Sequence, residues 1–354
     1  MFKINKVEPA NFYIDKAISM MEEFATKKRK EIDDRFFASK AVKDKSAIEI
    51  NLDKRKDLEL DKIRFLNENI RNSVKKIISD FPKFTKLNPV YLKLVDTNEF
   101  RVSDVEEALK RLNWIIVYAD ELTQNSEFKI KKSRNQQTIG FIMKKHLGKI
   151  NSLFRKNKDN FAILENTRKF MNQLPTFIEM FTVAIAGFPN VGKSTLMNKI
   201  TGSKVEIQNY PFTTKGLMFG YIENEKKEKE IQFIDTPGLL GRNKNNDIEK
   251  RADIIIKEYC DIIVFVFDAT EICGFKTDEQ LKLLRQTKAF DKKIILYFSK
   301  KDVYEKEEDE FMKENENIFK NFECFDDHKK LLEHILSIKN KKNKFDIRNI
   351  KVIR

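Results

Sequence analysis

The chain of 354 residues is 41% hydrophobic and 35% charged, enough for two ordinary domains with an apolar core each, which excludes a disordered protein. No apolar run approaches the roughly 18 residues of a membrane span, and the charged first ten residues do not fit a signal peptide. The net charge is +14, and residues 1–180 hold 37 Lys and Arg against 26 Asp and Glu. We therefore expect a cytoplasmic protein with no membrane contact and with a polyanionic partner, unless the lysines only solvate the surface.

Apolar residues recur at helical spacing throughout the first half of the chain, as at Ile63, Leu66 and Ile70. This periodicity predicts a basic bundle of four or five helices over residues 1–176. 

The predicted ends of these helices follow local sequence cues. Asp80-Phe81-Pro82 and Asn88-Pro89 are predicted to stop the long middle helix. Ser103-Asp104 is predicted to cap the next helix.

The span from Phe128 to Lys158 holds ten Lys or Arg and no Asp or Glu. Such a run fits one face of a helical hairpin that contacts RNA phosphates by shape, with affinity that falls steeply as salt rises. The alternative is a solvated face that contacts nothing. Three aromatic residues of this region are predicted to be core residues rather than platforms for base stacking: Trp114, Phe128 and Phe141.

After Leu174-Pro175, short apolar runs alternate with longer amphipathic stretches. This alternation predicts a mostly parallel sheet covered by helices over residues 177–338, so the expected fold class is α plus α/β. Residues 339–354 hold seven Lys or Arg and one Asp, and are predicted to form a basic C-terminal tail. The predicted strands are Val183–Ala186, Ile231–Ile234, Ile262–Phe267 and Ile294–Phe298.

The segment from Gly187 to Ser194, G-F-P-N-V-G-K-S, fits the phosphate-loop (P-loop) pattern G-x-x-x-x-G-K-[ST] between a predicted strand and a predicted helix. The glycines let backbone N–H groups turn onto the β-phosphate, and Lys193 reaches the β and γ oxygens. Ser194 offers its hydroxyl to Mg2+. The residues of this segment predicted to bind nucleotide are Asn190, Val191, Gly192, Lys193, Ser194 and Thr195.

The motif Asp235-Thr-Pro-Gly238 follows a predicted strand. This position places the Asp235 carboxylate where it can reach Mg2+ through water, and the Gly238 amide where the γ-phosphate would lie. Thr213 and Thr214 lie between the two motifs. A threonine there can report the nucleotide state, because its hydroxyl joins Mg2+ only when the γ-phosphate is present.

Ser299-Lys-Lys-Asp302 stands after a predicted strand, where guanine-specific proteins carry N-K-x-D. Asp302 can accept two hydrogen bonds from guanine, which adenine does not offer, and the Lys300 stem can lie against the base or the P-loop. Ser299 is shorter than Asn, so we expect it to lose contacts that tie the base site to the P-loop. The usual fifth motif is not recognisable.

Leu239 and Leu240 follow Gly238, where many small GTPases keep a glutamine that orients the attacking water. We therefore expect either slow hydrolysis or help from elsewhere. In related GTPases an asparagine at the position of Asn190 helps hold a potassium ion beside the phosphates. The alternative is an internal hydrogen bond within the loop.

Two sets of motifs, one in each half, occur together in this chain. The second half holds G-F-P-N-V-G-K-S-T from Gly187, Y-P-F-T-T-K from Tyr210, D-T-P-G-L-L from Asp235 and Cys273-Gly-Phe275. The first half holds F-K-I-N-K-V-E-P from Phe2, I-S-D-F-P-K from Ile78, N-P-V-Y from Asn88 and L-P-T from Leu174. Over residues 1–305 this set resembles the Obg-related GTPases, and most closely the family of nucleolar GTP-binding protein one.

The resemblance implies a GTPase that binds GTP or GDP with Mg2+, docks on rRNA and matures precursors of the large ribosomal subunit, with ribosomal proteins or other assembly factors as further partners. The chain looks like a short archaeal-type form, so a nucleolar location is expected only for a eukaryotic source. The resemblance favours Thr214 over Thr213 as the metal-binding threonine. The predicted metal ligands are then Ser194, Thr214 and Asp235, and the predicted catalytic residues are Lys193, Thr214, Gly238 and Asn190.

Two alternatives stay open. An RNA-binding scaffold would hold GTP or GDP in a nearly inactive, nucleotide-locked domain, which Ser299 and the two leucines favour. A translation-linked or stress GTPase of the wider Obg group would carry a glycine-rich domain, whereas the first half of this chain is predicted to be helical.

Overall fold

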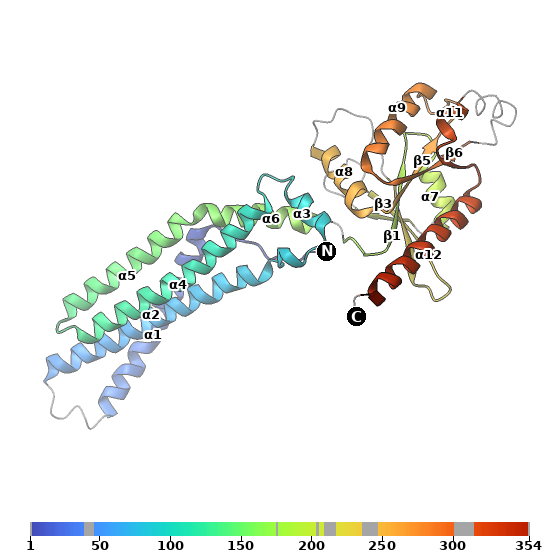
Figure 1. Ribbon diagram of the computed structural model, residues 1–354. Coiled ribbons are helices and arrows are strands. Elements are labelled where there is room, and N and C mark those ends of the chain that lie inside the picture. The colour runs from blue at the N-terminus through green and yellow to red at the C-terminus, as the bar shows by residue number, and fades with distance from the viewer. Residues whose placement is uncertain are drawn as a thin grey trace. The chain divides into compact units, whose positions relative to one another are not determined.

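The computed structural model describes residues 2–38, 46–174, 176–202, 205–208, 217–235, 247–300 and 315–352. The chain forms two compact units (Figure 1). The helical unit comprises Phe2–Leu87 and Asn98–Asn172, and the sheet unit comprises Asn88–Thr97 and Gln173–Arg354. Among the described residues, no helix is both long enough and apolar enough to cross a membrane.

The helical unit is a bundle in which α1, α2, α4 and α5 lie side by side (Figure 1). Its apolar positions at helical spacing are buried, and Ile63, Leu66 and Ile70 are each at most 1% exposed. The predicted helical bundle is therefore confirmed. Its helices are α1 (Ala10–Ala38), α2 (Ala47–Asp80), α4 (Val102–Lys132), α5 (Gln136–Lys156) and α6 (Lys158–Gln173), with a 3-10 turn at Phe84–Lys86.

The ends of these helices follow the predicted cues only in part. α2 ends at Asp80, before Pro82, as predicted. α4 begins at Val102, and Asp104 is its third residue, whose carboxylate accepts a hydrogen bond from the Arg101 N–H at 2.9 Å. The predicted cap at Ser103-Asp104 is therefore wrong by two residues, because Asp104 satisfies the helix end from inside the first turn.

The second predicted stop begins a helix instead. The Asn88 side chain accepts a hydrogen bond from the Val90 N–H at 3.0 Å and caps α3 (Pro89–Val95). Proline at the first helical position lacks only an N–H that would have no partner there. Asn88-Pro89 is thus a helix start rather than a helix stop.

The sheet unit is built on seven strands in the order β2-β3-β4-β1-β5-β6-β7. The strands from β4 to β7 in this order are parallel, and β2 and β3 are antiparallel additions at one edge. The predicted mostly parallel sheet is confirmed. The strands are β1 (Phe181–Ala186), β2 (Val205–Gln208), β3 (Leu217–Glu223), β4 (Lys229–Asp235), β5 (Ile262–Phe267), β6 (Lys293–Phe298) and β7 (Glu323–Phe325).

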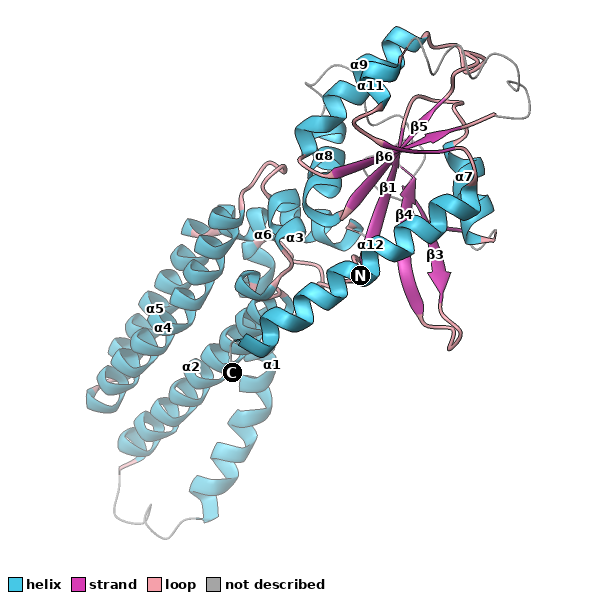
Figure 2. Cartoon of the chain, turned by 45° about the vertical axis from the view of Figure 1, so that its right-hand side comes forward, coloured by secondary structure: helices cyan, strands magenta, loops and turns pink. Residues whose placement is uncertain are grey.

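Helices cover both faces of this sheet (Figure 2). α7 (Lys193–Thr201) and α12 (His328–Val352) lie on one face, where Leu196 and Leu331 join the core formed by the strands. α8 (Asp247–Tyr259) and α9 (Thr277–Thr287) lie on the other face. The remaining elements are a 3-10 turn at Lys288–Phe290 and α11 (Glu316–Phe319).

One segment of the first half of the chain belongs to the sheet unit. α3 packs on α8, and the Tyr91 hydroxyl accepts a hydrogen bond from the Phe177 N–H at 2.9 Å. Arg251 donates to the Thr97 hydroxyl at 2.8 Å. Residues 88–97, which lie within the predicted helical domain, therefore pack in the sheet unit, because these tertiary contacts have no counterpart in local sequence. Residues 339–352 of the predicted tail continue α12 as helix.

A buried polar pair lies inside the helical unit. His146 on α5 is 1% exposed, and its Nδ1 atom lies 3.0 Å from the Ser126 hydroxyl on α4. Its Nε2 atom has no hydrogen-bond partner among the described residues. Burial, together with repulsion from Lys149, lowers the pKa of His146 to about 4.

This lowered pKa predicts an acid-sensitive bundle. The unfolded chain binds the His146 proton near pH 6.5, whereas the folded chain binds it only near pH 4. The free energy of unfolding should therefore fall by about 3 kcal/mol as the pH is lowered from 6.5 to 4. We expect urea unfolding of the helical unit, followed by the fluorescence of Trp114, to show this loss. In His146→Gln the loss should shrink, and parallel pH profiles for the two proteins would contradict the prediction.

Candidate nucleotide-binding site

The predicted motifs meet at the carboxyl edge of the sheet. β1 leads into the P-loop, β4 ends at Asp235, and β6 is followed by Ser299 and Lys300. The parallel register places Ile185 of β1 beside Asp235 and Ala186 beside Phe265 of β5. Ligands of open α/β sheets bind at this edge, where the chain crosses from one side of the first strand to the other.

The P-loop depends on its glycines. Gly187 has a φ of 139°, and a Cβ atom there would lie 2.6 Å from the Val266 carbonyl oxygen. Gly192, with a φ of 101°, directly precedes α7. Asn190 has a φ of 63°, a left-handed conformation that asparagine tolerates better than most residues. A loop of this kind at a helix N-terminus directs backbone N–H groups toward an anion.

Lys193 is buried beneath the loop. It is 7% exposed, and its Nζ atom donates to the Phe188 carbonyl oxygen at 2.6 Å. Burial lowers the pKa of Lys193, and the nearby Asp235 carboxylate opposes this effect. An anionic phosphate oxygen is a stronger acceptor than a peptide carbonyl, so Lys193 can exchange this bond for one to a nucleotide.

Two of the three predicted metal ligands, Ser194 and Asp235, lie side by side. The Ser194 hydroxyl donates to Asp235 Oδ2 at 2.7 Å, and Asp235 is 1% exposed. Burial raises the pKa of Asp235, which the Ser194 hydrogen bond and Lys193 oppose. Its Oδ1 atom is buried without a hydrogen-bond partner among the described residues. A buried carboxylate oxygen that lacks a partner, next to a hydroxyl, fits a hard divalent cation such as Mg2+, which would neutralise phosphate charge.

Ser299, one of the three predicted base-recognition residues, lies against the P-loop. The Ser299 N–H and hydroxyl both donate to the Phe267 carbonyl oxygen, at 2.9 and 3.2 Å. A Cβ atom built on Gly192 would lie 3.5 Å from the Ser299 Cβ atom, so the two loops are adjacent. The Ser299 hydroxyl is therefore bonded to the end of β5, and the described hydrogen bonds of its side chain include none to the P-loop.

Asp268 is a site residue that the sequence patterns did not reveal. It is fully buried after β5, and its carboxylate accepts hydrogen bonds from Lys300 at 2.7 Å and from the Cys273 N–H at 2.8 Å. Burial alone would raise the pKa of Asp268, but these bonds and those from Thr270 hold it below the ordinary value of a carboxyl. The available clue was a carboxylate directly after an apolar strand, the same place that Asp235 has after β4.

The loop after Asp268 is tied to the P-loop. Gln280 of α9 donates to the carbonyl oxygens of Asp268 at 2.8 Å and Phe275 at 3.1 Å. The Phe275 ring stacks on that of Phe188 in the P-loop, with centroids 4.1 Å apart and planes 18° apart. This contact gives a physical role to the Cys273-Gly-Phe275 motif, which supports the P-loop from the side.

The structure thus brings together the predicted site residues that it describes: Asn190, Val191, Gly192, Lys193, Ser194, Thr195, Asp235, Ser299 and Lys300. The described hydrogen bonds include none of the Asn190 side chain, so the internal bond considered for it is not seen among them. The other predicted site residues lie outside the described residues, and their roles stay predictions: Thr213, Thr214, Gly238 and Asp302.

Two family models match this chain, one over each half. A family model described as 50S ribosome-binding GTPase matches residues 182–300, and one described as NOG1 N-terminal helical domain matches residues 3–177. An uncharacterized protein of Methanocaldococcus jannaschii is 35% identical over 249 residues, which are 70% of this chain and 69% of that protein.

Nucleolar GTP-binding protein 1 of Drosophila melanogaster is 31% identical over 252 residues, which are 68% of this chain but 37% of the fly protein. This chain therefore spans well under half the length of that relative. A solved structure from Plasmodium falciparum, provisionally described as nucleolar GTP-binding protein 1, is 26% identical with a TM-score of 0.39, and covers 51% of this chain and 95% of that one.

The position of Ser299 predicts a gain-of-affinity substitution. In Ser299→Asn the longer amide can reach the adjacent P-loop, and one added hydrogen bond of about 1 kcal/mol should tighten GDP binding about fivefold. Titration with a fluorescent GDP analogue measures this affinity. Ser299→Ala, which loses only the bond to the Phe267 carbonyl, is the matched control and should bind much as the native chain does. Equal or weaker binding by Ser299→Asn would refute the prediction.

Proposed function

Because the chain belongs to the nucleolar GTP-binding protein 1 family, we propose that it is a GTP-hydrolysing switch that docks on rRNA and acts in assembly of the large ribosomal subunit. One observation carries this proposal. A P-loop with Lys193, Ser194 and Asp235 in place occurs in the same chain as a helical unit that matches the NOG1 N-terminal helical domain. The nucleotide site supplies the switch, and the helical unit supplies the docking surface.

GTP or GDP with Mg2+ is the proposed ligand of the site. Lys193 would contact the β and γ oxygens, and Ser194 and Asp235 would hold the cation, directly or through water. Thr214 and Gly238 are proposed to respond to the γ-phosphate, which would couple hydrolysis to a change of the loops that carry them. Lys300 is held by Asp268 beside the proposed base site.

We propose that potassium assists hydrolysis, because Leu239 and Leu240 cannot orient water as a glutamine does. Asn190 is exposed at the tip of the P-loop in a left-handed conformation, and its side chain has no described hydrogen bond, so it is available to a cation. A positive charge beside the β and γ phosphates neutralises the charge that develops as the γ-phosphate leaves.

This role of Asn190 predicts that GTP hydrolysis is about tenfold or more faster in potassium chloride than in sodium chloride. Asn190→Ala should lower the potassium rate to the sodium rate, and GDP affinity should change little because the substitution keeps the backbone N–H of the P-loop. Phosphate release, measured in both salts at equal ionic strength, tests this expectation. Equal rates in the two salts, with GTP binding intact, would contradict it.

The docking surface is proposed to be the hairpin of α4 and α5 together with the first residue of α6. All ten cations of the run between Phe128 and Lys158 are exposed there, and the one acidic residue paired with any of them among the described residues is Glu127, 3.8 Å from Lys131. A face of this charge attracts phosphates, with affinity that falls as salt rises. The cations are Lys129, Lys131, Lys132, Arg134, Lys144, Lys145, Lys149, Arg155, Lys156 and Lys158.

Cosedimentation with purified large ribosomal subunits tests the proposed function. We expect the chain to pellet with subunits in the presence of a non-hydrolysable GTP analogue, less with GDP, and less again as salt rises. GTP turnover should also accelerate when subunits are added. Binding that does not depend on the nucleotide, without faster GTP turnover on subunits, would instead identify an RNA-binding scaffold. No binding at all would contradict the proposed docking on rRNA.

A further inference from the structure

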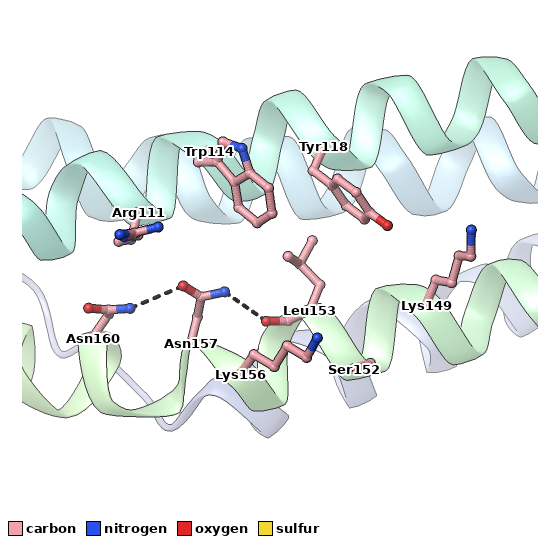
Figure 3. A pocket seen from close by; sticks show the side chains of 9 residues that line it. All are labelled: Arg111, Trp114, Tyr118, Lys149, Ser152, Leu153, Lys156, Asn157 and Asn160. Atoms are coloured by element: carbon pink, nitrogen blue, oxygen red, sulfur yellow. Dashed lines mark hydrogen bonds between the residues drawn. The ribbon is translucent and has the colours of Figure 1, made fainter.

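A groove of about 470 Å³ lies between α4 and the end of α5 in the helical unit (Figure 3). α4 contributes Arg111, Trp114 and Tyr118, and α5 contributes Lys149, Leu153 and Lys156. No Asp or Glu is among the residues that line the groove. The groove therefore combines aromatic rings with positive charge, and its buried Leu153 forms an apolar base.

Trp114 corrects one prediction made from the sequence. It was expected in the core, as were Phe128 and Phe141, but these side chains are 48%, 58% and 64% exposed. Trp114 stacks on Tyr118, with centroids 5.2 Å apart and planes 28° apart, and both rings project from α4 toward α5 (Figure 3). An indole that is held in place by a neighbour and half open to solvent is a platform for another flat ring.

The cations of the groove are available to a ligand. Lys149 and Lys156 are exposed, and the described residues include no ion-pair partner of either. Arg111 pairs with Glu107 at 2.8 Å on the same exposed helix face. Exposed pairs of this kind are weak, so a phosphate can displace Glu107 from Arg111.

We propose that this groove binds an unpaired nucleotide of RNA, with its base on Trp114 and its flanking phosphates at Lys149 and Lys156. The proposal rests on the proposed rRNA docking and deepens it, because it adds a contact with a base to a surface otherwise expected to recognise shape. Stacking requires a base whose face is free, which unpaired nucleotides offer and paired duplexes do not. An acidic peptide would satisfy the lysines but would leave the indole without a partner.

Trp114 is the single tryptophan of the chain, so its fluorescence reports on this groove. The probes are single-stranded oligoadenylate, a blunt RNA duplex, inorganic polyphosphate and an acidic peptide, each titrated into the full chain. We expect oligoadenylate to quench the fluorescence with saturation. The duplex and polyphosphate, which supply charge without a free base face, should leave it nearly unchanged. If polyphosphate or an acidic peptide quenches as strongly as oligoadenylate, the proposal is wrong.

Matched variants separate the groove from general charge. Lys149→Gln/Lys156→Gln should lower the slope of log affinity for oligoadenylate against log salt by about 1.4, as expected when two contacts to a single strand are lost. Lys27→Gln/Lys30→Gln removes the same charge from exposed positions on α1 and should leave the slope unchanged. Identical behaviour of the two pairs would overturn the proposal.

Two further variants test the stacking. By filter binding, Trp114→Ala should weaken oligoadenylate binding about tenfold, and Trp114→Phe, which keeps a flat ring, should recover most of it. Circular dichroism confirms that both variants are folded. If Trp114→Phe binds no better than Trp114→Ala while both are folded, stacking is not the contact.

Failure of this proposal is distinguishable from failure of the proposed function. If the chain cosediments with subunits in a nucleotide-dependent manner but oligoadenylate does not quench its Trp114 fluorescence, the proposed function stands and the nucleotide-binding role of the groove is wrong. If oligoadenylate quenches the Trp114 fluorescence but the chain does not cosediment with subunits, the groove binds a nucleotide and the proposed role on the large subunit is wrong.

Discussion

The parallel pairing of β1 with β4 and β5 is the constraint on which the nucleotide site depends. Every residue of β1 and β5 is buried, so the apolar side chains of both sheet faces fix the register. This register sets Asp235 at the strand end beside the P-loop, where it meets the Ser194 hydroxyl. A slip of one residue would move the carboxylate by about 3.3 Å, beyond hydrogen-bond reach of Ser194.

The same edge of the sheet carries several buried charges. Lys193, Asp235 and Asp268 are each at most 7% exposed, and burying a charge is costly unless hydrogen bonds compensate for the lost water. Asp268 is compensated by Lys300 and by backbone N–H groups, which orders the loop beside the P-loop. Asp235 keeps one oxygen without a partner among the described residues, which is the feature that suits a cation. The described part of the site is therefore held together by hydrogen bonds within the chain.

The helical unit divides its chemistry between the inside and the outside of the same two helices. Positions three or four residues apart share a helix face, so each helix turns one face to the core. Ser126 of α4 and His146 of α5 lie on these inner faces and meet there. Other faces of the same helices carry Trp114, Tyr118 and the exposed lysines of the groove. One hairpin thus provides both packing for the bundle and a charged surface that suits a polyanion.

The sequence by itself determined the helical bundle, the parallel strands and the residues of the P-loop, because apolar spacing and the glycine-lysine pattern are local. Local patterns did not reveal that Asn88 starts a helix of the sheet unit, that Asp268 anchors Lys300, or that Trp114 is exposed. Each of these depends on the tertiary packing. α3 packs on α8, and Asp268 is bonded to Lys300, which follows β6. Trp114 lies on a face of α4 that the bundle does not cover. Only the tertiary structure decided them, because burial and pairing are properties of what a residue packs against.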